Sequence, residues 1–432
     1  MPNTNNVKVS AAKQVAVNTP IDPNHVLPIR ALPSLDRTIA TKGDPVIVGR
    51  GIANGKYPVS ADVKGGIPLS PRACGGMGLL LKSNLGAEAT PPQVCAIIRM
   101  RYTGSSASAK ITTDLGAKTI NAKIGALGSE ANDAAFGTTG TISLTNVAFD
   151  TVTELVAAIE AYADYECKLV TGDPAATIVS VMAGTFQAKG KWAVLVLTSA
   201  TSGAYDHLFT PDFTAGQERP VLTIQKDGYQ DNYRYGDCVV SALSFSAALK
   251  GEVEGDAEIL GLTEAIGQTA MSALVLPDVQ PFVFAQGITS IGGVDYNYCR
   301  QASAKFAIAH REDGYGQSSL DRAFHQKDIF SPSGDATLRL DAVSVLERPK
   351  IETGTRVSIL LIYFGAAAKE VGGKVRECMI IEVAYALLDS FDTPENSGSL
   401  DAKLAWTGVL PGGTVYDPAV SIHLITTDSA VY

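Results

Sequence analysis

The sequence predicts a mainly β protein in which two tandem copies of one β fold, each with a short flanking helix, carry an inserted α+β module. The 432-residue chain is longer than the roughly 250–300 residues at which a single hydrophobic core stops growing. Short runs of alternating apolar residues, separated by glycine-rich turns, dominate it. The order of these runs recurs once along the chain, which is typical of a duplicated fold.

Period-two alternation identifies the expected strands, because side chains of a strand point to opposite faces in turn. The clearest runs are YPVSADV (57–63), PVLTIQ (220–225), ASAKFAIA (302–309), ATLRLDA (336–342), VSILLIYF (357–364) and LDAKLAW (400–406). One helix is strongly indicated at TVTELVAAIEAYADY (151–165). Thr151 and Glu154 form a capping box there, in which each side chain accepts a bond from an otherwise unpaired backbone N–H.

The internal repeat links Cys238–Gly261 with Cys378–Gly408. Both segments begin with cysteine, run through alternating residues, turn, and return to a glycine. Upstream, a strand, a short helix and a second strand recur in the same order, with the helices expected at 75–86 and 318–329. A chance likeness between two β-rich segments is the alternative explanation.

These patterns give a predicted domain organisation. Residues 1–40, with five prolines, form an extended arm. Residues 41–95 and 202–262 form the first fold, and residues 96–201 are inserted into it as a surface-exposed α+β module. Residues 263–280 are a linker, and 281–432 form the second fold with a C-terminal strand.

The hairpin of Val239–Leu249 and Glu252–Leu260 carries the candidate functional residues. One face is apolar, and the other has Ser244 and Ser246 on one arm and Glu252, Glu254, Asp256 and Glu258 on the other. Each arm spans roughly 35 Å, longer than a usual strand of about 17–20 Å, and so needs neighbours on both edges. The acidic side is either a solvated outer face or the wall of a passage that must not hold polyanions such as DNA.

The chain resembles the tail tube proteins of long-tailed bacteriophages. The resemblance rests on GLLLKSNLGA, YDHLFTP, RPVLTIQKDGYQDNYRYGDCVVSALSFS and GEVEGDAEILG, and through the repeat it extends to about Gly408. It implies a β-barrel or sandwich with a flanking helix, and rings of six folds whose long hairpins line a channel for the viral genome. The lumen-lining residues it implies are Ser244, Ser246, Glu252, Glu254, Asp256 and Glu258, and by the repeat Asp401 and Lys403.

The resemblance also implies partners and a location. Because one chain carries two folds, three chains would form a pseudo-sixfold ring; six chains would form a true hexamer if the repeat is illusory. Further expected partners are adjacent rings, the tape-measure protein and transiting DNA in the lumen, and the tail terminator and distal tail proteins. The expected location is the virion tail, after assembly in the cytoplasm of a bacterial host, without membrane insertion.

Composition agrees with a structural role. Only 18% of residues are charged, which suggests that much of the surface meets other subunits, and the net charge of −9 argues against a surface that grips phosphates. The six cysteines are widely spaced, which favours reduced thiols.

No catalytic residue, cofactor or metal site is predicted. The five histidines lie far from one another and from cysteine, and nucleophile, phosphate-loop and metalloprotease motifs are absent. The acidic row could attract calcium, although a rigid strand holds its acids in a line. Alternative functions are a sheath, baseplate or capsid-decorating protein, or a β-rich glycan-acting enzyme that uses two opposed acids.

Overall fold

The computed structural model describes residues 7–43, 56–199, 203–212, 219–228, 231–310, 327–365, 370–372, 374–396, 399–409 and 418–432. Strands dominate these residues and helices are few, which confirms the predicted mainly β class. The strands pair antiparallel, as expected for a chain whose strands are joined mostly by short turns. No helix in the described ranges is long and apolar enough to cross a membrane.

Two long strands, β17 (Asn232–Ala248) and β27 (Cys378–Asp392), connect the main sheets. The first half of each strand lies in one sheet and the second half in another. A register shift marks this change in both strands, between Val240 and Ala242 and between Leu388 and Ser390. A bulge bends a strand and increases its twist, so each strand can leave one sheet and enter the next without ending.

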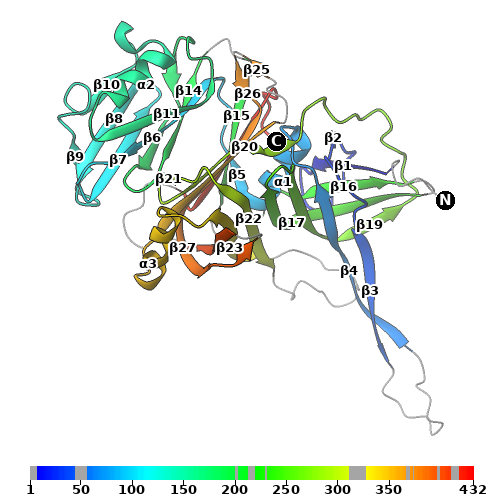
Figure 1. The fold of residues 1–432 in the computed structure, drawn as a ribbon. Helices are drawn as coiled ribbons and strands as arrows, with labels where there is room; N and C mark the ends of the chain where they lie inside the picture. Colours follow the sequence, from blue (N-terminus) through cyan, green and yellow to red (C-terminus); the bar gives the residue numbers. More distant parts are fainter. Residues whose placement is uncertain are drawn as a thin grey trace.

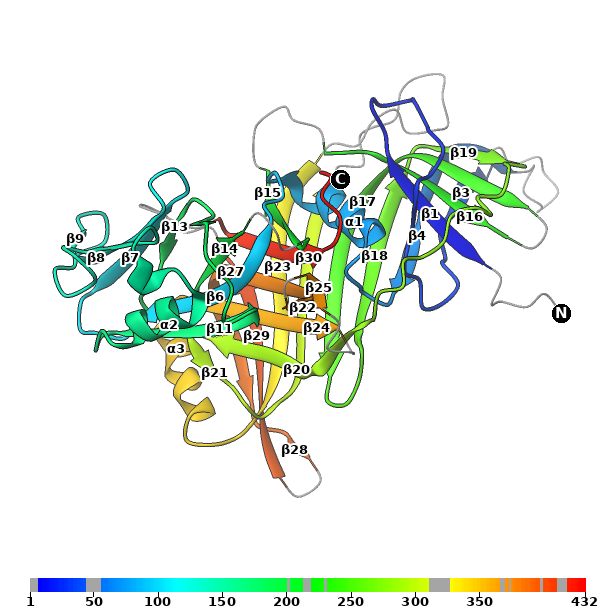
Figure 2. The same cartoon turned by 90° about the horizontal axis from the view of Figure 1, so that it is seen from above.

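The second halves of β17 and β27 lie in one continuous sheet, here called the long sheet (Figure 2). Its order is β3 (Asp36–Gly43), β4 (Lys56–Leu69), β18 (Val253–Gly261), β17, β22 (Cys299–His310), β23 (Lys327–Arg339), β29 (Ser399–Gly408) and β27. β28 (Glu395–Asn396) extends the β27–β29 hairpin toward its tip. Both predicted long hairpins are therefore present, and they share one sheet.

The first halves of the long strands lie in two further sheets. The first has the order β2 (His25–Val26), β1 (Lys8–Lys13), β16 (Leu222–Asp227), β17 and β19 (Thr263–Ile266). The second has the order β21 (Val294–Asp295), β20 (Phe282–Ile291), β24 (Val357–Gly365), β27, β30 (Val420–Thr426), β15 (Tyr205–Pro211) and β5 (Gly86–Glu88). A separate short ribbon pairs β25 (Glu370–Gly372) with β26 (Val375–Arg376).

One apolar core joins the two parts of the chain predicted as folds. These are residues 41–95 with 202–262, here called the first half, and residues 281–432, here called the second half. The core includes Leu243, Phe245 and Ala257 of the first hairpin and Leu404 and Trp406 of the second. Helix α1 (Gly75–Leu85) is almost fully buried on it, and the Asn84 side-chain amide donates to the carbonyls of Val240 and Phe306, each at 3.2 Å. The predicted helix at 75–86 is thus confirmed and connects β17 to β22.

The helix of the second half differs from the prediction. Most of the expected helix at 318–329 lies outside the described residues, and its last residues, Lys327–Ile329, already belong to β23. The short described helices come after β23 instead, as a 3-10 turn at Ser344–Glu347 followed by α3 (Arg348–Glu352). Each half therefore has a hairpin, a helix, a strand, a long strand and a return strand in this order.

Residues 94–198 form two small sheets around a core of their own (Figure 1). The first sheet has the order β11 (Tyr165–Gly172), β6 (Val94–Tyr102), β14 (Ala193–Thr198) and β12 (Ser180–Val181). The second joins β10 (Thr141–Ser143), β8 (Thr119–Gly125), β7 (Ser108–Asp114) and β13 (Gly184–Gln187), with β9 (Ala131–Asn132) on β8. Helix α2 (Val152–Glu160) begins at Thr151 with the predicted capping box and follows a 3-10 turn at Val147–Phe149.

The sheet of β6 and β14 is buried on both faces. One face, with Leu195 and Leu197, contributes to the core within residues 94–198. The other face, with Val194 and Val196, packs against β24, β27 and β30 of the second half, including Ile362. This explains why both strands are apolar without alternation, a pattern typical of a strand covered on both sides.

Two segments differ from the expected arm and linker. Lys8–Lys13 is not an unpacked arm, because β1 pairs along its whole length with β16 and its Val9 and Ala11 are buried. The nearby prolines lie outside that strand, so they do not interrupt its hydrogen bonds. Thr263–Ile266, at the start of the expected linker, forms β19 at the edge of the same sheet.

Candidate functional site

The acidic hairpin has the predicted geometry. Ser244 pairs with Asp256 and Ser246 with Glu254 across β17 and β18. Glu252, just before β18, and the three acids along it are exposed, whereas the residues between them are buried. Because strand side chains alternate, this places Glu252, Glu254, Asp256 and Glu258 on the polar face of the long sheet and the apolar residues in the core.

Basic residues from other segments pair with three of these four acids. Arg30 lies 3.3 Å from Glu254 and 3.4 Å from Asp256, and Lys305 lies 3.2 Å from Glu258. All of these side chains keep at least a third of their surface exposed, so each pair contributes at most about 1 kcal/mol. Sequence reasoning missed Arg30, because nothing in the local pattern places it beside β18. The alternation in ASAKFAIA could have identified Lys305.

Ser244, Ser246 and Lys403 line one shallow hollow of about 530 Å³ on the polar face. The hollow crosses β17, β22, β23, β29 and the end of β27, so it brings the two predicted hairpins together. Its other polar residues include Asp335, whose carboxylate accepts a hydrogen bond from Ser303, and Asp389, which accepts one from Thr407 at 2.6 Å. The polar face is thus acidic at β18 and mixed in charge toward β29.

Asp401 does not belong to this exposed surface. Its side chain is 2% exposed and pairs with Arg300, whose Nε lies 2.9 Å from Oδ1. The residue opposite on β23 is Arg339. The prediction that Asp401 lines the lumen therefore does not fit the structure, because its carboxylate is covered by residues of its own chain. Lys403, two residues along β29, is exposed and faces Asp392 across the hairpin.

A family model described as phage tail tube protein matches residues 169–408, which is more than half of the chain. The chain belongs to the phage tail tube protein family. The match ends at Gly408, where β29 and the second predicted hairpin end. No protein with a curated description matches the chain. The mainly β fold and the family together make the chain a structural component of a phage tail tube.

The cysteines and two of the histidines, His207 and His423, are buried in this tail tube protein. All six cysteines are free and buried, and burial raises the pKa of the Cys95 thiol to about 11, so a reactive thiolate is disfavoured. His207 is fully buried against Glu88 at 2.9 Å, and His423 pairs with buried Asp206 at 2.9 Å. These pairs connect β5, β15 and β30. Among the described residues no group of histidine, cysteine and acidic side chains is arranged to hold a metal ion.

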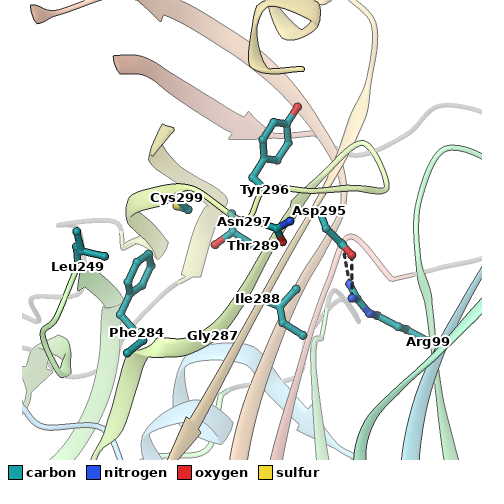
Figure 3. A pocket seen from close by; sticks show the side chains of 11 residues that line it. Arg99, Leu249, Phe284, Gly287, Ile288, Thr289, Asp295, Tyr296, Asn297 and Cys299 are labelled. Carbon is teal, nitrogen blue, oxygen red and sulfur yellow. Dashed lines mark hydrogen bonds and ion pairs between the residues drawn. The ribbon is translucent and has the colours of Figure 1, made fainter. Parts of the chain in front are cut away.

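A second hollow of the tube protein, of about 230 Å³, lies where β20 and β21 meet β6 (Figure 3). Arg99 and Asp295 line it and pair with each other, and Tyr296 donates a hydrogen bond to buried Glu347 at 2.7 Å. The charged groups of this hollow are therefore occupied by internal contacts, which indicates a structural role.

Proposed function

We propose that this chain assembles into rings that stack into the hollow tail tube, and that the polar face of the long sheet lines the channel through which viral DNA passes. Three chains, each with two tube folds, would form a pseudo-sixfold ring. The observation that carries this proposal is the single sheet in which both long hairpins present one polar face, with a shallow hollow where they meet.

The chemistry of this face supports passage without binding. Glu252, Glu254, Asp256 and Glu258 lie at one side of it. The hollow beside them is lined by serines and a threonine, together with two lysines and two aspartates. DNA carries one charge per about 1.7 Å of axis, and proteins hold it by placing lysine or arginine against the phosphates. A wall with an excess of carboxylates and small hydroxyl groups would repel DNA weakly, so the DNA could slide.

Residues 96–201 fit an inserted module on the outer side of the tube in this proposal. They have a core of their own, and they pack on the sheet of β24, β27 and β30 rather than on the long sheet. The chain enters and leaves this region through the adjacent strands β6 and β14. Tape-measure, terminator and distal tail proteins would be the remaining partners, at the lumen and at the ends of the tube.

The test is a charge reversal on the acidic strand. Virions whose tube protein carries Glu252→Lys and Glu254→Lys should form tubes of normal length, because both side chains are exposed in the subunit. Their DNA ejection, triggered in vitro and followed by a DNA-binding dye, should be slower, and the delay should shrink as salt is raised.

The matched control is Glu160→Lys with Glu352→Lys, which adds the same charge at exposed sites on α2 and α3, outside the acidic hairpin. Control virions should eject DNA at the wild-type rate. Equal ejection rates for both variants would refute a channel wall at β18, and failure of the wild-type protein to form tubes would refute the tube role itself.

A further inference from the structure

Strands β15 and β30 form a junction between the two halves of the chain, separate from the pairing of β17 with β22. β15 belongs to the first half and pairs on its other edge with β5, whereas β30 belongs to the second half and pairs on its other edge with β27. The adjacent residues Asp206 and His207 lie in this junction, and both are completely buried. Burying an ionisable group costs free energy unless the group is paired, so the partners of these two residues determine how the junction behaves.

On one face of the junction, Asp206 of β15 pairs with His423 of β30. The Nδ1 of His423 lies 2.9 Å from one carboxylate oxygen of Asp206 and 3.1 Å from the other. Burial alone would lower the pKa of His423, but the charge and hydrogen bond of Asp206 and the charge of Glu382 outweigh it and raise this pKa. The pair therefore favours an imidazolium on β30 facing a carboxylate on β15.

On the opposite face, both ring nitrogens of His207 meet oxygen acceptors. Nδ1 lies 2.9 Å from Oε1 of Glu88, and Nε2 lies 2.8 Å from the carbonyl oxygen of Asp428. The Oε2 of Glu88 accepts hydrogen bonds from Lys82 Nζ and from the Tyr432 N–H, each at 2.9 Å, so Glu88 acts as a carboxylate. A neutral imidazole has one N–H and satisfies one of the two acceptors around His207, whereas the imidazolium donates to both.

Residues 427–432, here called the strap, follow β30 and lie against His207. The Tyr432 ring stacks on the His207 ring with the centroids 4.5 Å apart, and the Tyr432 residue is 6% exposed. The Tyr432 ring also lies so close to Gly78 of α1 that a Cβ at that glycine would overlap it. The main-chain oxygen of Tyr432 accepts a hydrogen bond from Lys82 of α1. His207 thus holds the strap at both ends, through the Asp428 carbonyl and the Tyr432 ring.

Other ionisable groups also face the two imidazoles. Besides Glu88 and Lys82, those near His207 and the strap are Lys13, His25, Cys74, Asp428 and Tyr432. Besides Asp206, those near His423 are Glu382, Lys191 and Cys378.

The thiols and His25 stay uncharged under the conditions in which the junction histidines titrate. Burial raises the pKa of Cys74 to about 11 and also raises that of Cys378, so both thiols remain neutral up to pH 9. Burial lowers the pKa of His25, so this ring loses its charge at a lower pH than an ordinary histidine. Burial and the charge of Lys82 lower the pKa of Lys13, which donates to the Tyr432 main-chain oxygen, so alkali weakens this contact in the same direction.

We infer that the β15–β30 junction is a proton-dependent clasp, in which protonated His207 and His423 hold β30 and the strap against the first half and release them in alkali. The inference goes beyond the proposed function, because it concerns each subunit rather than the channel. Deprotonation of His207 leaves a ring lone pair facing either the Asp428 carbonyl or the Glu88 carboxylate, and an unsatisfied buried acceptor is costly.

The direction of the pH dependence follows from His423. A histidine whose pKa is raised in the folded state stabilises the protein fully below the unfolded value of about 6.5, and the stabilisation is lost as pH rises through the folded value. The clasp is therefore closed in mildly acidic solution and opens in alkaline solution.

The first test is urea unfolding of the purified full-length chain at pH 6 and pH 9. The folding equilibrium constant of the wild type should fall at least about tenfold more over this range than that of His207→Gln with His423→Gln, because the amide side chains do not titrate. The matched control is His310→Gln on β22, outside the junction, which should keep the wild-type pH dependence. The same pH dependence in the wild type and the double variant would overturn the inference.

Hydrogen exchange of the wild-type protein is a second test, which holds even if the double variant does not fold. The amides of Ala430 and Tyr432 donate to Asp428 Oδ1 and Glu88 Oε2. Their protection, measured as the intrinsic exchange rate at each pH divided by the observed rate, should fall at least about tenfold from pH 6 to pH 9. The amides of Leu243–Ala247 in the β17–β22 pairing should keep their protection. Unchanged protection of the strap, or an equal loss at both places, would overturn the clasp.

Nuclear magnetic resonance of the ¹⁵N-histidine-labelled wild type tests the charge of His207 directly. At pH 6 its ring should give two N–H signals, identified by their proximity to the Tyr432 ring protons, and at pH 9 it should give one. A single N–H signal at both pH values would show a neutral ring that does not clasp the strap, and two signals at both would show a ring that does not respond to pH. Either result would overturn the inference.

Discussion

Arg99 and Asp295 form a bidentate ion pair, with Nη1 at 2.7 Å from Oδ1 and Nη2 at 2.9 Å from Oδ2 (Figure 3). Arg99 lies on β6, within residues 94–198, and Asp295 lies on β21 of the second half. Trp192 donates its ring N–H to Asp295 at 3.1 Å, and the Arg99 guanidinium lies 4.4 Å from the centroid of the Trp192 ring. Beside the apolar contact of β14 with β24, this polar contact fixes the position of residues 94–198.

Asp295→Asn should therefore destabilise the protein by about 3 kcal/mol, the lower end of the range for breaking a buried pair, because it leaves the Arg99 charge without a counter-ion. Arg99 is 6% exposed and Asp295 19%. Urea unfolding followed by tryptophan fluorescence would measure this, since Trp192 lies at the contact. The matched control is Glu352→Gln on the exposed part of α3, which should change stability by less than about 0.5 kcal/mol. A similar small loss for Asp295→Asn would contradict a structural role for the pair.

The same pair predicts an acid dependence. Burial alone raises the pKa of Asp295, but the hydrogen bonds and charges of Arg99 and Lys168 outweigh it and hold this pKa below its ordinary value. A carboxylate with a lowered folded-state pKa stabilises the protein fully above the unfolded value of about 3.9, and the stabilisation is lost as pH falls through the folded value. The difference in unfolding free energy between wild type and Asp295→Asn should therefore be constant near pH 6 and shrink in acid. A difference that stays constant down to the acid transition would contradict this.

The sequence and the structure predict different results for a deletion of residues 97–199. A projecting module could be removed without harm, but Leu360, Ile362 and Phe364 of β24 are covered by β6 and β14. Replacing residues 97–199 by a short linker should expose this apolar face and make the chain aggregate. The same deletion with Leu360, Ile362 and Phe364 changed to threonine should recover soluble protein. Soluble, tube-forming chains from the simple deletion would show that this contact is dispensable.

The sequence predicted the parts of the fold that depend on local pattern. Alternation in 239–249 and 252–260 places each side chain on a face, and the capping box at Thr151 and Glu154 marks the start of α2. The acidic row of β18 was predictable for the same reason. A single slip of register would have buried the acids, so the pattern strongly constrains the pairing.

The remaining features depend on contacts between distant segments, which local pattern does not encode. Arg30 reaches Glu254 and Asp256 from far along the chain, and Asp401 is covered by Arg300 although its strand alternates regularly. The prolines of residues 1–40 predicted an unpacked arm, but β1 lies between them and pairs with β16. Strand partners far apart in sequence are decided by the packing of whole sheets.

The ribbon formed by β3 and the first part of β4 projects from the body of the subunit (Figure 1). Its described residues are largely exposed on both faces and include Ile39 at 49%, Tyr57 at 45% and Val59 at 44% exposure. A two-stranded ribbon is marginally stable alone, and exposed apolar side chains on it favour a protein partner. We expect this partner to be a subunit of the adjacent ring. Changing Ile39, Tyr57 and Val59 to serine should leave the unfolding free energy of the subunit within about 1.5 kcal/mol of wild type, because each exposed site contributes at most about 0.5 kcal/mol.

Assembly should respond differently from stability in this ribbon variant. Electron microscopy should show rings or short stacks in place of long tubes, since we expect the lost apolar contacts to lie between rings. Leu127→Ser with Val147→Ser, at exposed sites within residues 94–198, is the control and should assemble normally. Long tubes from the ribbon variant would show that ring stacking depends on another surface.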